Sequence, residues 1–165
     1  MDRELYREFI ELSADLMDEH GLPHTAGRVI GALLVCVPPH MSLDELAEDV
    51  GASKGAVSMA TQMMVRLGIL ERISLPGERR HYYRLPENIL EDMMTGEREH
   101  LRMHQRVFEK GIDLLANEPI EAKMRLIELQ AYMDFILGEM PGLSERWAEQ
   151  RDDLIQQRIK ELQKR

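Results

Sequence analysis

Apolar residues recur at helical spacing in two short runs between residues 42 and 67. The first run begins after Ser42, and Glu45 three residues later completes a capping box, so we expect a helix to start at Leu43. Gly51 suits the left-handed backbone conformation that ends many helices. The apolar face of this helix consists of Leu43, Leu46, Ala47 and Val50. The first run therefore predicts a short helix with a signal at each end.

The second run predicts another helix after a turn of three residues. Ser53 can cap it, and Gly68 should stop it after Leu67. The face expected to pack inward carries Val57, Ala60, Met64 and Leu67. The opposite face carries Gly55, Ser58, Met59, Gln62 and Arg66. Small and hydrogen-bonding groups on that face suit close approach to a nucleic acid better than a solvated face of Glu and Lys would.

Residues 69–86 alternate loosely between apolar and polar and predict a two-stranded ribbon. The turn dipeptide Pro76-Gly77 separates the strands, and Arg79 and Arg80 follow it. In an isolated hairpin such arginines are usually solvated charges. Directly behind a helix-turn-helix, they are better explained as a probe of phosphates or of the DNA minor groove.

The remaining apolar pattern predicts helices on both sides of this segment, so the fold class is mainly α: a winged helix-turn-helix domain with a two-stranded β wing and flanking dimerisation helices. The expected flanking helices span residues 2–19, 25–35 with Thr25 as cap, 87–116, 119–137 and 143–162. We expect residues 1–20 to form an N-terminal dimerisation helix, 21–86 the DNA-binding domain, and 87–165 a helical dimerisation and possible effector region.

The C-terminal helices carry more apolar surface than one small core can bury. Together with the first helix they most simply form a dimer interface. A monomer with a self-contained helical bundle is the alternative. The residues expected in the interface are Phe9, Leu12 and Leu16 with Trp147, Leu154 and Leu162.

Charge is distributed unevenly along the chain. The whole sequence has a net charge of −9, which argues against general affinity for nucleic acids. Residues 1–52 carry −8 and residues 86–165 carry −5, whereas residues 53–85 carry +4. The one positive stretch coincides with the proposed second helix and wing. Such a distribution favours specific, salt-sensitive DNA binding.

The segment from about Pro23 to Pro86 resembles the DNA-binding domain of the MarR superfamily, and the run from Gly21 to Gly31 is most similar to its GbsR-like branch. The resemblance implies a homodimeric, signal-responsive transcriptional regulator. We expect a repressor that binds an inverted-repeat operator. The residues expected to contact DNA are Ser53, Lys54, Gly55, Ser58, Met59, Gln62, Arg66, Arg79, Arg80 and His81. Met59 stands where these families often have Arg, which leaves the base preference open.

Other functions have less support in the sequence. No Gly-rich phosphate loop or nucleophile elbow is present, so we expect neither an enzyme nor a cofactor. A winged-helix adaptor that binds proteins is the alternative, and Met59 and Met63 are a hint of the apolar patch it would need. Arg66, Arg79 and Arg80 favour DNA. Without a signal peptide or an apolar stretch long enough to span a bilayer, a cytoplasmic location is expected.

Three further features remain open. His100 and His104 stand at i and i+4, a spacing that can bind a metal, although a surface pair without metal is the simpler reading. Cys36 lies in an apolar run, which indicates a buried, inert thiol rather than a redox sensor. The C-terminal region is rich in methionine, which could line an effector cavity or simply fill a core. Candidate effector contacts are Met93, Met94 and Leu101.

Overall fold

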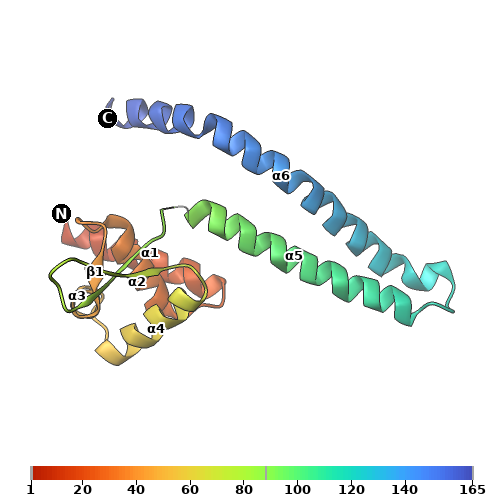
Figure 1. The fold of residues 1–165 in the computed structure, drawn as a ribbon, viewed down its shortest axis with the longest axis horizontal. Coiled ribbons are helices and arrows are strands. Elements are labelled where there is room, and N and C mark those ends of the chain that lie inside the picture. Colours follow the sequence, from red (N-terminus) through yellow and green to blue (C-terminus); the bar gives the residue numbers. More distant parts are fainter. Residues whose placement is uncertain (1, 88, 165) are drawn as a thin grey trace. The chain divides into compact units, whose positions relative to one another are not determined.

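The structure, a computed structural model, describes residues 2–87 and 89–164, without the side chains of residues 90–95. The chain forms two compact units, Met1–Ile89 and Leu90–Arg165 (Figure 1). The elements are α1 (Arg3–Glu19), α2 (His24–Val35), β1 (Met41–Ser42), α3 (Leu43–Asp49), α4 (Lys54–Arg66), β2 (Glu71–Ser74), β3 (His81–Arg84), α5 (Ile89–Leu114) and α6 (Ile120–Leu162).

The two helices α3 and α4 begin and end close to the expected residues. At the start of α3, the Ser42 backbone N–H donates to Glu45 Oε2 at 2.7 Å, and the Glu45 backbone N–H donates to Ser42 Oγ at 3.3 Å. The capping box is therefore confirmed. Gly51 adopts a positive φ of 63°, and Ser53 Oγ accepts from the Ala56 backbone N–H at 3.2 Å to cap α4. Local sequence signals set both boundaries of this helix-turn-helix.

The core of the first unit lies between α2, α3 and α4. Leu46, Val57 and Met64 are fully buried there. Thr61 joins them, because its hydroxyl donates to the Val57 carbonyl at 2.9 Å and so needs no water. The prediction that Leu67 packs inward is wrong, since its side chain is 58% exposed. Leu67 is the C-cap of α4, where the chain leaves the helix and no longer follows its buried face.

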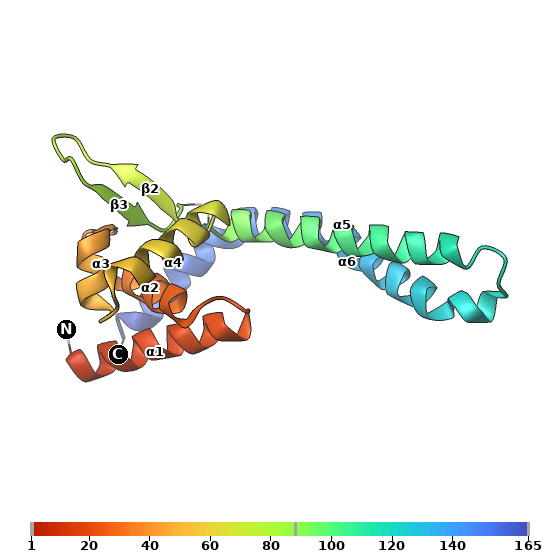
Figure 2. The same ribbon diagram turned by 90° about the horizontal axis from the view of Figure 1, so that it is seen from below.

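The sheet has three antiparallel strands in the order β1-β3-β2. In Figure 2 the β2–β3 hairpin projects from the helices of the first unit as a wing. β1 was not expected, because two residues are too short to show a period. It pairs Met41 with Tyr83 and Ser42 with Tyr82, which ties the wing to the residues just before α3.

Helices α1 and α2 pack backbone to backbone. A Cβ atom on Gly27 would lie 2.5 Å from the Ser13 carbonyl oxygen, and one on Gly31 would lie 2.9 Å from Ser13 Cβ. Only glycine allows this approach. The expected cap Thr25 is wrong, because α2 already begins at His24 with Pro23 as its N-cap. Pro23 has a fixed φ of −58°, so the helix can start directly after it without a side-chain cap.

The second unit is a hairpin of two long helices, α5 and α6 (Figure 1). Gln105 donates a hydrogen bond to Asp134, and Leu126 packs against Gly111, so the helices run antiparallel. The expected break between residues 137 and 143 is wrong, because α6 continues through Pro141. Proline fits a helical φ, but it removes one backbone donor and its ring crowds the carbonyl of Leu137. The long helical segments on both sides, residues 120–137 and 143–162, outweigh that local cost.

Much of the apolar surface of this hairpin is open to solvent in the single chain. Among its described residues, Met140 is the one buried apolar side chain. Large exposed apolar residues follow both helices: Met103, Val107, Leu114, Ile120, Met124, Leu129, Tyr132, Phe135, Leu143, Leu154, Ile155, Ile159 and Leu162. Such an extended apolar surface is typical of an interaction site.

Candidate nucleic-acid interface

Helix α4 presents one solvent-facing side that is free of packing. Val57 and Met64 anchor the opposite side in the core. Met59 is 76% exposed, and an added Cβ at Gly55 would meet nothing closer than Ser53 Oγ at 3.9 Å. The predicted contact residues of this helix that are exposed are Ser53, Lys54, Gly55, Met59, Gln62 and Arg66, while Ser58 is half-buried. The helix can therefore approach a large partner along its whole outer face.

A hydrogen bond between two side chains on this face occupies one of the donor hydrogens of Gln62. Gln62 Nε2 donates to Ser58 Oγ at 2.9 Å, one turn away on the helix. The second amide hydrogen and the amide oxygen of Gln62 remain available, which is the donor–acceptor pair that an adenine base edge requires. Lys54, at the start of α4, forms an ion pair with Asp44 at 2.9 Å and so lies against α3.

Two arginines near the tip of the wing are exposed to solvent. Gly77 lies in the turn after β2 and has a positive φ of 82°, a conformation that glycine adopts without strain. Arg79 is exposed and forms no ion pair with any side chain that the structure describes. Arg80 lies 3.7 Å from Glu78 and places its guanidinium 5.9 Å from the centre of the Tyr82 ring. Both arginines can reach an external anion.

Sequence reasoning missed the side chains that support Arg80. The Tyr82 ring is buried and meets the His40 ring edge-on, with 5.2 Å between centroids. An aromatic face under a guanidinium restricts the positions that Arg80 samples. The alternation of the strand could have revealed Tyr82, whereas His40 lies in a loop and gave no signal.

Arg84 and His81, both on β3, already contact neighbouring polar side chains. Arg84 pairs with Glu71 at 2.7 Å and with Glu87 at 3.5 Å, so it is unsuited to bind DNA. His81, a predicted contact, is exposed and lies 3.3 Å from Ser74 Oγ. Arg72 on β2 is also exposed and forms no ion pair with a described side chain, so the positive charge of the wing lies both on β2 and near the tip.

The predicted dimer residues are accessible, but they belong to different units. On α1, Leu12 and Leu16 are exposed and Phe9 is half-buried. On α6, Leu154 and Leu162 are exposed and Trp147 is half-buried. Each set forms part of an apolar stripe on its own helix.

The structure describes only part of the predicted effector site. The side chains of Met93 and Met94 lie outside the described residues, and Leu101 is half-buried. The described residues do form an open, polar hollow elsewhere, between α1 and α3. It is lined by Arg3, Tyr6, Arg7, Met41, Glu45, Glu48 and Asp49. The Tyr6 hydroxyl donates to Asp49, and burial together with this bond raises the pKa of Tyr6.

Within the described residues, neither the histidine pair nor Cys36 lies in a group of side chains arranged as a metal or redox site. His100 and His104 are exposed, and His104 Nδ1 lies 2.9 Å from the carbonyl oxygen of His100. Cys36 is half-buried, and burial raises the pKa of its thiol, which disfavours the reactive thiolate. Within the described part of the chain, no helix is long and apolar enough to cross a membrane.

The fold and its exposed face define a winged helix-turn-helix protein of the DNA-binding class. A family model described as "MmpR5-like MarR family transcriptional regulator" matches residues 88–150. The HTH-type transcriptional regulator MmpR5 of Mycobacterium tuberculosis is 34% identical over 141 residues, which cover 82% of this chain and 84% of that protein.

Two further relatives agree. The HTH-type transcriptional repressor OpcR of Bacillus subtilis is 31% identical over 86 residues, 52% of this chain and 46% of that protein. A crystal structure of a transcriptional regulator is 31% identical with a TM-score of 0.72, covering 87% of this chain and 98% of its own. The chain belongs to the MarR family of winged helix transcriptional regulators, which are DNA-binding proteins and not enzymes.

Proposed function

We propose that this chain is a homodimeric repressor of the GbsR-like branch, which binds an inverted-repeat operator in the cytoplasm. The observation that carries the proposal is the outer face of α4, where a Gln62–Ser58 pair and Met59 face solvent beside an arginine-tipped wing. The repressor function draws further support from the relative OpcR, which is named as a repressor. The branch rests on the run from Gly21 to Gly31.

We expect three side chains of α4 to contact the DNA bases. Gln62 presents a donor and an acceptor to adenine N7 and N6, and Met59 offers an apolar group to a thymine methyl. Ser58 contributes a hydroxyl, and Gly55 lets the backbone come close. These chemistries favour a half-site that contains A·T pairs.

Two copies are needed for tight binding, because a single helix and wing make few contacts. The exposed apolar stripes on α1 and α6 support a dimer, in which the two α4 helices meet successive major grooves. The half-sites should lie roughly one helical turn, about 10 bp, or a multiple of that apart.

The test is to select bound fragments from genomic DNA and to measure binding of Gln62→Ala to the selected operator. The substitution should cost roughly 1–3 kcal/mol and relax the preference at one position of each half-site. Operators with single base changes serve as the internal control. If Gln62→Ala weakens every sequence equally, the base-reading role is wrong.

We also propose an effector site in the first turns of α5, near Met93, Met94 and Leu101. Flexible methionine side chains adapt to ligands of varied shape. A ligand shifts the dimer only if it prefers one geometry over another, and a coupling of about 1–3 kcal/mol is typical. Candidate metabolites should raise the melting temperature and release the operator. Ligands that raise the melting temperature without changing DNA binding would contradict the switch.

The alternative, a protein-binding adaptor, is favoured by one observation, the 76% exposure of Met59. An adaptor would retain its partner when the wing arginines are removed and would show no selected DNA. The genomic selection therefore separates the two functions directly.

A further inference from the structure

Three side chains that can bind a metal meet where α1 turns into α2, away from the outer face of α4. Asp15 and Asp18 lie one turn apart near the end of α1, and His24 is the first residue of α2. Gly21, with a φ of 73°, lets the chain reverse between them. One oxygen of each carboxylate and one nitrogen of His24 all lie within 4.8 Å of one another.

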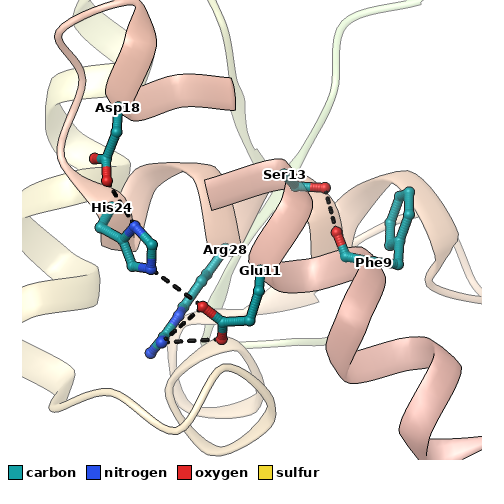
Figure 3. Close-up of polar contacts among 6 residues, drawn as sticks. All are labelled: Phe9, Glu11, Ser13, Asp18, His24 and Arg28. Carbon is teal, nitrogen blue, oxygen red and sulfur yellow. Dashed lines mark hydrogen bonds and ion pairs between the residues drawn. The ribbon is translucent and has the colours of Figure 1, made fainter. Parts of the chain in front are cut away.

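The His24 ring is held in a fixed orientation (Figure 3). Its Nε2 lies 3.1 Å from Glu11 Oε2, and its Nδ1 lies 2.7 Å from Asp18 Oδ2. Asp18, followed by Glu11, raises the pKa of His24. Histidines that bind metals commonly donate their other ring N–H to a carboxylate, which orients the ring and sets its tautomer. Glu11 takes that place here and leaves Nδ1 directed at Asp18.

Glu11 is itself anchored on α2. Arg28 forms an ion pair with Glu11 at 2.9 Å and a second contact at 3.1 Å (Figure 3). The close packing of Gly27 and Gly31 against Ser13 holds α1 at a fixed distance from α2. The positions of the three potential ligands are therefore set by the helix pair and need no large rearrangement.

We propose that Asp15, Asp18 and His24 bind one divalent transition-metal ion. Two carboxylate oxygens and an imidazole nitrogen suit ions such as Zn²⁺, Co²⁺ or Mn²⁺, whereas Ca²⁺ and Mg²⁺ prefer oxygen ligands alone. The ion takes the place of the proton between His24 Nδ1 and Asp18. Water completes the coordination, because both aspartates are exposed.

The required side-chain movement is small. Bonds of about 2.0–2.2 Å place the ligand atoms of one Zn²⁺ ion roughly 3–3.5 Å apart, closer than the present limit of 4.8 Å. Among the described residues, Asp15 forms no hydrogen bond or ion pair, so its carboxylate can rotate inward without breaking a contact.

The proposal is tested by titrating the metal-free, untagged full chain with Zn²⁺ in competition with a chromophoric chelator. Visible absorption of Co²⁺ serves as a second readout. We expect one ion per chain at this site. Asp15→Asn should weaken binding at least about tenfold and leave the far-ultraviolet circular dichroism unchanged. Glu11→Gln should cost about tenfold as well, because His24 loses its orienting carboxylate.

Two control variants make the result specific. Glu8→Gln removes another exposed carboxylate of α1, and His100→Ala/His104→Ala removes the exposed histidine pair of α5. Both should bind Zn²⁺ as the unmodified chain does. The proposal is overturned if the chain fails to bind Zn²⁺, or if Asp15→Asn binds it unchanged. It is also overturned if the histidine-pair variant abolishes all binding. DNA binding enters none of these measurements.

Discussion

Glu45 closes the capping box at the start of α3, and its charge makes that box depend on pH. The Ser42 backbone amide, then the Ser42 hydroxyl, hold the pKa of Glu45 below its ordinary value of 4.5, and Arg80 adds a smaller effect. Because the folded pKa is lowered, the carboxylate stabilises the fold fully above that ordinary value. The contribution is lost as pH falls below 4.5 and through the folded pKa.

Glu45→Gln keeps a side chain that can cap but removes the titration. Its free energy of unfolding should therefore fall less than that of the unmodified chain between about pH 5 and pH 3. Urea unfolding at a series of pH values measures the difference. Glu48→Gln is the control, since it removes a carboxylate from the same helix without touching the capping box. Equal acid profiles for Glu45→Gln and the unmodified chain would contradict this role.

At the scale of elements, the α1–α2 contact has no room for a side chain at Gly27. Gly27→Ala should destabilise the chain by about 1–3 kcal/mol, because overpacking exceeds the roughly 1 kcal/mol that alanine gains in a helix. Gly96→Ala is the matched control, since no atom that the structure describes lies within 4 Å of its added Cβ in α5, and it should be neutral or stabilising. Thermal unfolding gives both values. A Gly27→Ala chain as stable as Gly96→Ala would show that the helices can move apart freely.

The wing should bind phosphates without reading bases. Replacing Arg79 and Arg80 with Ala should lower affinity for all sequences and reduce the slope of log affinity against log salt by about one unit per lost contact. Arg125→Ala, a solvent-exposed arginine of α6, is the charge control and should leave the slope unchanged. An unchanged slope in the wing variant would identify these arginines as solvated turn residues.

The sequence predicted the elements whose limits are set by neighbouring residues. The starts of α3 and α4 were predicted from Ser42, Glu45 and Ser53, and the structure confirms these caps. The errors lie where distant contacts or context decide. β1 forms because Met41 pairs with Tyr83, which lies far away in the sequence. Helix α6 continues through Pro141 because long helical segments lie on both sides of it. The Tyr82–His40 contact likewise depends on tertiary packing, so no local pattern reveals it.

At the scale of the whole molecule, the exposed apolar stripes require a partner, and a second copy of the chain is the partner we propose. Light scattering at micromolar concentration should show a species of about twice the 19.1 kDa chain mass. Deleting residues 143–165 should give a monomer with greatly reduced operator affinity, because each half alone makes few contacts. Substitution of the exposed Glu8 on α1 by Gln serves as a control and should leave the dimer intact. A 19.1 kDa species for the full chain would refute the dimer.

Ser42 belongs to two elements at once, since β1 pairs it with Tyr82 while its hydroxyl caps α3. A local opening that frees the β3 strand from β1 also disturbs the first turn of the helix-turn-helix. The two elements therefore form one cooperative unit of opening, and their slowest backbone amide protons should exchange with solvent at a common rate. We therefore expect a DNA sequence that loosens the pairing of β1 with β3 also to loosen the first turn of α3.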